Sequence, residues 1–533
     1  MNVIEQYDAN NVYYPISVNN CTQIQKLYFG TIDENIYKSK SDWGDGTSNN
    51  VISTSNYSAK NYSNNYTGKI KIYSNPKKVK EIIFDLGISN LGTETNPLGY
   101  IKNVDLTPDI LDFFPNCEKL LFNHYCYGSG DLSFQGKVIG EWATKCGNKL
   151  KNLELRNNDY PQSNPTFDLN LIPSNSVLES LYLGSGYAVN NSFVNVSGSL
   201  NNLPSSCKII YLGNDKTGTT NSVSGNISPS VEELSRLGRN TISGNINTFS
   251  SNFRYLYLLG SNTVSGVLPS FPYLTYINLG GNNTISGNLI NISTAGTISI
   301  TGMNTISGNI PNLPNTTLLT INGSNNLTGS VPVLNSITQF TVNGNNTLNG
   351  VLNLPNATLI TVGGQNTITA LNLPKSNGVV ISGQNKITGD LFTQINSATS
   401  NIQIGGENTI SSISGVFSNC STFSIGGQNT ISGDILSKCP NANSIVIAGN
   451  NTMNAYNSKT YPSNMGTLDI TGLATLSSTM VDQILIDLAR DVTNWSGSKR
   501  ITLKGNCQPP SSASAAARAN LTSAPKNVTL LTN

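Results

Sequence analysis

The phrase NTISGN occupies residues 240–245, 283–288 and 304–309, and variants of it return about every 19 to 23 residues. The variants are NTVSGV at 262–267, NNLTGS at 325–330, NTLNGV at 346–351, NTITAL at 366–371, NKITGD at 385–390, NTISSI at 408–413, NTISGD at 429–434 and NTMNAY at 451–456. Self-similarity at this period is typical of stacked repeats, in which each unit buries its apolar face against its neighbours. The stretch therefore predicts a solenoid.

A short run in which a polar residue stands between two apolar ones precedes most of the phrases. Examples are Ile277-Asn278-Leu279, Ile298-Ser299-Ile300, Leu319-Thr320-Ile321, Phe340-Thr341-Val342, Ile360-Thr361-Val362, Ile402-Gln403-Ile404 and Phe423-Ser424-Ile425. This alternation predicts one strand per period with one face buried. A Gly-Gly or Asn-Gly pair then turns the chain.

The phrase itself has a polar and an apolar position with separate roles. We expect its first Asn to bond its side-chain amide to the backbone of neighbouring coils, because no helix or sheet reaches those turn groups. The apolar residue two places later should point inside. These residues are Ile242, Val264, Ile285, Ile306, Leu327, Leu348, Ile368, Ile387, Ile410 and Ile431.

Written out, Leu274-x-x-Ile277-x-Leu279-x-x-Asn282, continuing to Ile285-x-Gly287, resembles the leucine-rich repeat over about ten copies. The ending of residues 306–311, ISGNIP, resembles its LxGxIP form. The resemblance implies a curved solenoid with a parallel sheet on its concave side, used mostly to bind other molecules. A right-handed parallel β-helix is the alternative fold, since its coils have a similar length. The single strand-like alternation per period favours the leucine-rich repeat.

The composition of the chain limits which classes of partner it can bind. The 533 residues exceed one compact core, charged residues make up 11 %, and the net charge is +2. Only seven charged residues lie between 240 and 455: Arg254, Lys375, Lys386, Asp390, Glu407, Asp434 and Lys438. Without a basic face or a long apolar run, we expect no nucleic-acid partner and no membrane insertion. Asn, Ser, Thr and Gly supply solubility, as in extracellular and virion β-proteins, although the start of the chain lacks a signal-peptide pattern.

The eight cysteines stand at wide, irregular intervals, at Cys21, Cys117, Cys126, Cys146, Cys207, Cys420, Cys439 and Cys507. This spacing fits neither a zinc site nor a disulfide framework, so we expect buried free thiols. A disulfide bond between two of Cys117, Cys126 and Cys146 is the alternative to free thiols. No metal or cofactor is expected.

Residues 1–80 are not repetitive. Short strands are predicted at 12–16, 25–29, 41–43 and 69–73. The sequence DWGDGT at 42–47 resembles the mark of polycystic-kidney-disease (PKD) domains, although Asn64 stands where that family has His. The resemblance implies an Ig-like β-sandwich with Trp43 between its sheets. Asp42 and Asp45 raise calcium binding as an alternative, but two carboxylates fall short of a ligand shell.

Three further regions are predicted. Residues 81–220 resemble degenerate, longer leucine-rich repeats with strands near 119–123, 152–157, 180–184 and 209–214, and with room for a helix or 3₁₀ turn. Residues 221–470 are the regular repeats. Residues 471–533 form a small α/β cap, with helices near 477–490 and 511–523 and strands near 501–503 and 528–530. The ending resembles the C-termini of leucine-rich-repeat proteins from Bacteroidetes bacteria and their phages. The fold class is mainly β.

The sequence contains no clear catalytic motif. The single histidine, His124, lies two residues from Cys126 in a polar loop, and Ser129 lacks the Gly-x-Ser-x-Gly motif. A carboxylate pair for glycoside hydrolysis would have to come from Glu118, Asp131, Glu141, Glu154, Asp159 and Asp168, and no spacing singles out two of them. We expect no enzyme.

The middle residue of each strand should face the concave side. Tyrosines gather in the first half of the stack, where they could stack on sugar rings. The predicted binding residues are Tyr182, Tyr211, Tyr255, Tyr257, Tyr276 and Asn278. The competing interpretation is that tyrosine simply suits strands.

These features predict a non-enzymatic virion appendage, a phage tail- or capsid-associated fibre used for host attachment. Its N-terminal domain would dock on other virion proteins, and its solenoid would bind a host-surface glycan or protein; a homo-oligomer is compatible with this. The first alternative is a secreted, cell-surface bacterial adhesin. The second is a β-helical tailspike that hydrolyses glycans.

Overall fold

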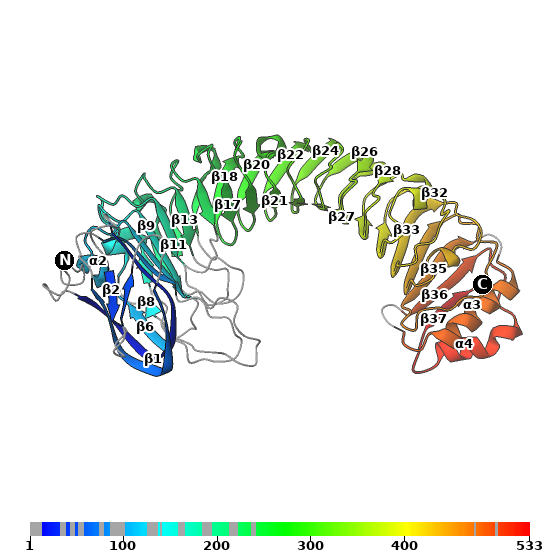
Figure 1. Cartoon of the computed structure of the whole chain (residues 1–533). Coiled ribbons are helices and arrows are strands. Elements are labelled where there is room, and N and C mark those ends of the chain that lie inside the picture. Colours follow the sequence, from blue (N-terminus) through cyan, green and yellow to red (C-terminus); the bar gives the residue numbers. More distant parts are fainter. Residues whose placement is uncertain are drawn as a thin grey trace. The chain divides into compact units, whose positions relative to one another are not determined.

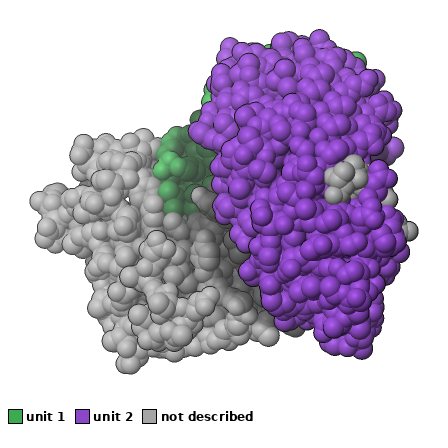
Figure 2. Space-filling view, turned by 90° about the vertical axis from the view of Figure 1, so that its right-hand side faces the viewer, with its two compact units in different colours: residues 1–269, 279–284 green, residues 270–278, 285–533 purple. Residues whose placement is uncertain are grey.

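The computed structural model of the protein describes residues 13–31, 39–42, 48–51, 58–73, 79–85, 102–124, 137–138, 141–157, 166–183, 195–212, 222–235, 241–473, 476–495 and 499–533. They divide into two compact units, coloured separately in Figure 2. The first unit comprises residues 1–269 and 279–284, and the second comprises residues 270–278 and 285–533.

The regular coils of the second unit share a first parallel sheet. Its strands pair in step, so that Ser299 lies opposite Thr320, and Thr320 opposite Thr341. Along each strand, buried apolar residues alternate with outward ones, as the sequence predicts. The strands are β19 (Tyr276–Leu279), β21 (Thr297–Ile300), β23 (Leu318–Ile321), β25 (Gln339–Val342), β27 (Leu359–Val362), β29 (Gly378–Ile381), β31 (Asn401–Ile404), β33 (Thr422–Asn429), β34 (Ser444–Gly449) and β35 (Thr467–Leu473).

Many coils contain a second strand, which the repeated phrase itself forms, so the prediction of one strand per period is incomplete. These strands build a second parallel sheet on the other side of the coil (Figure 1), with β20 (Thr284–Asn288), β22 (Thr305–Asn309), β24 (Asn326–Ser330), β26 (Thr347–Asn353) and β28 (Thr367–Asn372). Strands β30 (Thr388–Asp390) and β32 (Thr409–Ser412) pair separately. The remaining side is irregular or 3₁₀, with η5 (Leu289–Ile292), η6 (Leu391–Thr393) and η7 (Leu436–Lys438). The chain is thus mainly β, a solenoid of stacked coils with parallel sheets, as the sequence predicts.

A ladder of buried asparagines joins the coils. Asn325 accepts a hydrogen bond from the backbone N–H of Ile306 at 2.8 Å and donates one to the carbonyl of Asn322 at 2.8 Å. Equivalent acceptor bonds recur along the stack, and the donor bond recurs at every described ladder residue except Asn346. The ladder residues are wholly buried at Asn262, Asn283, Asn304, Asn325, Asn346, Asn366, Asn385, Asn408, Asn429 and Asn451. The predicted role of the phrase's first Asn is confirmed. All ten apolar residues predicted to point inside are also buried.

The first unit contains longer repeats built in the same way. Its first sheet comprises the parallel strands β5 (Val79–Asp85), β7 (Lys119–His124), β9 (Asn152–Asn157), β11 (Ser180–Leu183), β13 (Ile209–Leu212), β15 (Glu233–Ser235) and β17 (Tyr255–Leu258). Its second strands are β10 (Thr166–Asp168), β12 (Asn195–Ser199), β14 (Ser222–Ser224), β16 (Ser243–Asn245) and β18 (Thr263–Val267). The extra length holds the predicted helical turns, α2 (Asp109–Phe113), η1 (Ala143–Lys145), η2 (Leu169–Leu171), η3 (Leu200–Asn202) and η4 (Ile246–Thr248).

The N-terminal region differs from the prediction of short, separate strands. Residues predicted as two strands form one, β1 (Tyr13–Thr31), which pairs antiparallel with both β4 (Ser58–Tyr73) and β5. The register of the β1–β4 pairing shifts three times between residues 18 and 27, where the sequence is rich in polar residues. The remaining strands are β2 (Ser39–Asp42), β3 (Ser48–Val51), β6 (Lys102–Leu106) and β8 (Lys137–Val138). Residues 43–47 lie outside the described residues, so the PKD-like sandwich stays a prediction.

The C-terminal cap agrees with its prediction. Helix α3 (Ser478–Asp491) begins after Ser477, whose hydroxyl accepts the N–H of Met480 at 3.3 Å. The second helix is shorter than predicted, as η8 (Ser512–Ser514) followed by α4 (Ala515–Thr522). Strands β36 (Arg500–Gly505) and β37 (Thr529–Thr532) extend the first sheet beyond β35. Within the described residues, no helix is long and apolar enough to cross a membrane.

Replacing Ile300 by Asp tests the inward assignment. Ile300 is wholly buried in β21, so the carboxylate would be placed in the core without a partner, at a cost of about 3–5 kcal/mol. We expect a large drop in the free energy of unfolding measured with urea. Ser299→Asp, on the outward face of the same strand, is the matched control. Equal destabilisation by the two variants would contradict the assignment.

Replacing Asn325 by Ala tests the ladder. The change strands the N–H of Ile306 and the carbonyl of Asn322 in the interior, at about 1–3 kcal/mol for each group. The exposed neighbour Asn326→Ala should change stability little. The measurement is the thermal unfolding midpoint of both variants. A ladder variant as stable as the control would show that these bonds do not stabilise the stacking of the coils.

Candidate functional site

Two tyrosines form a stacked pair on the outward face of the first unit's first sheet. Tyr182 in β11 lies directly opposite Tyr211 in β13 in the strand register. Their ring centroids are 5.4 Å apart, with 26° between the ring planes. Both residues are half-buried, whereas the strand residues on either side of each ring point into the core. The pair thus presents two parallel rings fixed on a rigid sheet.

Strand β17 carries the next two predicted residues. Tyr255 is 47 % exposed and Tyr257 is half-buried, while Leu256 and Leu258 between and after them are fully buried. Tyr255 lies opposite Glu233 of β15, and burial raises the pKa of Glu233, partly offset by Arg254. Both tyrosines are therefore outward, as predicted.

The last two predicted residues lie on β19, in the second unit. Both are half-buried, and the Asn278 side-chain nitrogen donates to the Tyr276 hydroxyl at 3.4 Å. Beyond them the middle residues of the first-sheet strands are small and mostly neutral, namely Ser299, Thr320, Thr341, Thr361, Val380, Gln403, Ser424 and Val446. Further along the described part of this sheet, Asp469 of β35 and Arg500 of β36 form an ion pair of 2.7 Å.

Of the carboxylates considered for catalysis, Glu118 and Asp168, both in the described part of the chain, make separate structural contacts. Glu118 pairs with Lys80 and with Lys151, the latter at 3.1 Å, and Asp168 caps η2 through the N–H of Asn170 at 2.9 Å. The side chains of His124, Cys126, Ser129, Asp131 and Asp159 lie outside the described part of the chain. Across the residues that the structure describes, no three His, Cys, Asp or Glu side chains are grouped as metal ligands would be.

The described cysteines are buried free thiols, as predicted: Cys117, Cys146, Cys207, Cys420, Cys439 and Cys507. Cys117 and Cys146 do not pair with each other. Burial raises the pKa of Cys117, Cys146 and Cys207 to about 12, which leaves them protonated and unreactive at neutral pH.

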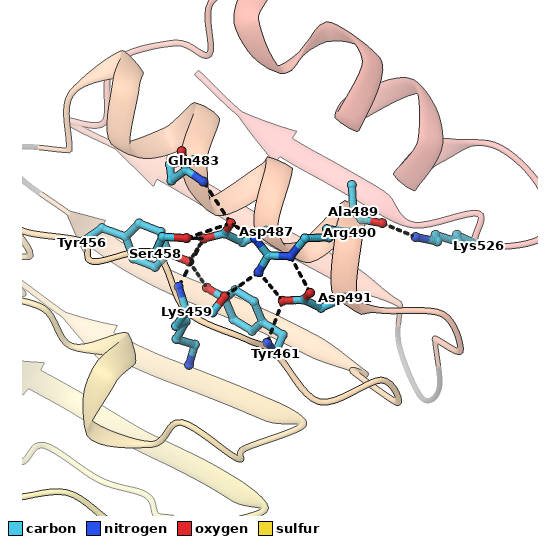
Figure 3. A network of polar contacts seen from close by, with 10 residues as sticks. All are labelled: Tyr456, Ser458, Lys459, Tyr461, Gln483, Asp487, Ala489, Arg490, Asp491 and Lys526. Atoms are coloured by element: carbon cyan, nitrogen blue, oxygen red, sulfur yellow. Dashed lines mark hydrogen bonds and ion pairs between the residues drawn. The ribbon is translucent and has the colours of Figure 1, made fainter.

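A dense polar network, which the sequence analysis did not predict, joins helix α3 to residues 456–461 (Figure 3). Asp487 of α3 is wholly buried and accepts hydrogen bonds from Tyr456 at 2.8 Å, Gln483 at 2.9 Å and Arg490 at 2.8 Å. The Ser458 hydroxyl adds a further bond at 2.9 Å. One carboxylate therefore ties the loop after the last regular coil to the helix that covers it.

Lys459 belongs to the same network. Its ammonium group donates to the carbonyl of Leu436 at 2.9 Å and lies 4.5 Å from the ring centroid of Tyr461. Burial lowers the pKa of Lys459 to about 8. The Asp491 carboxylate accepts the backbone N–H of Tyr461 at 3.0 Å, and the Arg490 guanidinium beside it lowers the pKa of Asp491. The polar groups of this network hydrogen-bond to one another and to the backbone, so the network stabilises the packing of α3 against residues 456–461.

No protein-family model matches the chain, and no curated protein does. Among solved structures, the chain is similar to the plant peptide hormone receptor RGFR1 in complex with RGF2, with 17 % sequence identity and a TM-score of 0.42, over 80 % of this chain and 85 % of that one. It is also similar to the PEPR1–AtPEP1 crystal structure, with 19 % identity and a TM-score of 0.47, over 80 % of this chain and 66 % of that one.

Proposed function

We propose that the chain is a non-enzymatic binding protein whose first-sheet face holds a neutral, polar ligand, a glycan of a host surface. The observation that carries the proposal is the stacked pair of Tyr182 and Tyr211 on an outward sheet face. Aromatic rings that present an apolar face and a hydroxyl suit sugar rings, which have apolar faces edged by hydroxyls. A rigid parallel sheet holds the rings in place before a ligand arrives, which lowers the entropic cost of binding.

The low charge of the regular repeats supports the same ligand class, while next to the tyrosine pair itself Glu154 lies opposite Tyr182 in the strand register. The outward middle residues from Ser299 to Val446 are hydroxyl, amide or valine side chains, and charged residues are rare throughout the regular repeats. Such a surface attracts neither anionic nor cationic polymers over long range. Short-range stacking and hydrogen bonds are the interactions that remain.

The proposal includes a location, the particle of a phage that infects a Bacteroidetes host. The Asn-, Ser-, Thr- and Gly-rich composition and the resemblance of the C-terminal ending support it. The N-terminal region would dock on other virion proteins as a tail or capsid appendage. A secreted adhesin would present the same face from a bacterial surface.

Replacing both stacked tyrosines tests whether they bind the glycan. Tyr182→Ala with Tyr211→Ala should weaken binding to host cells or purified host glycan by about tenfold or more, because aromatic contacts contribute about 0.5–1.5 kcal/mol each beyond their buried area. Thr320→Ala with Thr341→Ala, on the same kind of sheet face, is the control. Binding by the parent should depend weakly on salt. Unchanged adsorption by a folded tyrosine variant would rule out this site.

Locating the chain tests the particle assignment. Mass spectrometry of purified virions should detect peptides of the protein, and antibody labelling should place it on the tail or capsid. Detection on the surface of uninfected cells, with none in particles, would replace the virion proposal by the adhesin.

A further inference from the structure

The row of outward positions along the first unit's first sheet has tyrosines on three strands and a serine between two of them. Tyr182 of β11 lies opposite Tyr211 of β13, and Tyr211 lies opposite Ser235 of β15. Continuing the parallel pairing of β15 with β17 by one residue brings Tyr257 beside Ser235. All four residues belong to the first unit. We call the space over Ser235, between Tyr211 and Tyr257, the serine gap.

The tyrosines on both sides of the serine gap face outward. Each is half-buried, and the strand residues directly before and after each one are fully buried. The ring centroids of Tyr182 and Tyr211 are 5.4 Å apart. This distance is close to the usual strand spacing of about 4.8 Å, so these two rings stand over their own strands. Tyr182 therefore covers one face of Tyr211, and the other face of Tyr211 is turned toward the serine gap.

The serine gap has room for one ring. Tyr211 and Tyr257 are two strands apart, which is about 9.6 Å at the usual strand spacing of about 4.8 Å. Two aromatic rings that both contact a ring held between them need about 7–8 Å between their planes, since carbon atoms in contact are about 3.5–4.0 Å apart. A sugar ring needs more than this minimum, because it is puckered and has hydrogens on both faces. The spacing therefore suits a sugar ring better than a flat aromatic one, which would contact a single wall.

An acidic residue adjoins the gap. Glu233 precedes Ser235 by two positions in β15, and the fully buried Leu234 between them places Glu233 on the outward side of the sheet. Glu233 is half-buried. Burial raises the pKa of its carboxyl, whereas the charge of Arg254 acts in the opposite direction. A carboxylate accepts hydrogen bonds, and each hydroxyl of a sugar donates one. Glu233 thus adds a polar contact for a sugar ring held between the two tyrosines.

We propose that one pyranose ring of a glycan binds in the serine gap, stacked between Tyr211 and Tyr257, with a hydroxyl donating to Glu233. This inference rests on the proposed function and narrows it from an aromatic surface to one ring-sized position. Both faces of the same sugar ring gain an aromatic contact there. The mutually stacked pair of Tyr182 and Tyr211 has no such space between its rings.

The experiment fills the gap without removing an aromatic residue. Ser235→Phe adds a third ring between Tyr211 and Tyr257, whereas Ser235→Ala leaves the gap open. The full chain is applied to an array of immobilised neutral oligosaccharides of glucose, galactose, mannose and N-acetylglucosamine. The parent and Ser235→Ala should bind the same oligosaccharides equally well. Ser235→Phe should bind them at least about tenfold more weakly, because the sugar loses its contacts with both tyrosines. Circular dichroism checks that both variants fold.

The direction of the change separates this inference from a flat aromatic surface, on which Ser235→Phe would strengthen binding. If Ser235→Phe binds as well as the parent or better, while Tyr182→Ala with Tyr211→Ala loses binding, the gap is not the site and the glycan proposal stands. A parent that binds none of the oligosaccharides overturns both. Capture of a tyrosine-containing peptide in place of the sugars, lost in Ser235→Phe, would overturn the inference by assigning the gap to a protein side chain.

Discussion

The structure depends on a hydrogen bond between a buried asparagine side chain and the backbone of the preceding coil. Each ladder residue is fully removed from water, which would be unfavourable for an unpaired amide. Asn304, for example, accepts the N–H of Ile285 at 3.0 Å and donates to the carbonyl of Thr301 at 2.7 Å. The same residue thus closes its own turn and fixes the distance to the preceding coil. The repeated phrase follows from this requirement, since an apolar side chain at this position would leave both groups without these partners.

Sequence patterns were sufficient for the parts of the fold that depend on local burial. Alternation in runs such as residues 298–300 identified the first sheet and its inward faces, and the cap at Ser477 identified α3. The second sheet was missed because its strands contain glycines with positive φ, such as Gly308 at 84° and Gly329 at 78°. Such residues indicate a turn when no neighbouring strand is known. Strand β1 was divided for a similar reason, since bulges that accommodate polar residues depend on partners far along the chain.

For the candidate site, the sequence likewise predicted the orientation of the side chains but not their contacts. Period-two alternation placed Tyr182, Tyr211 and Tyr257 outward, and they are. Their stacking depends on the register of neighbouring strands, which one sequence does not contain. The Asp487 network was out of reach for a related reason: an acid within an apolar helix segment gave the only signal, and its partner Tyr456 comes from a separate loop. Local rules therefore identify which side a residue faces, whereas contacts between elements require the structure.

The pairing of β1 with β5 has a consequence for how the protein is made. Strand β1 precedes β5 in the chain, and every later strand of the first sheet that the structure describes pairs with one already synthesised. The ladder bonds also join residues close in sequence, such as Asn325 and Ile306, 19 positions apart. Low contact order of this kind favours fast folding. Each regular coil can thus be completed on its predecessor as the chain leaves the ribosome, whereas β1 finds its partners only after β5 and β6 have been synthesised.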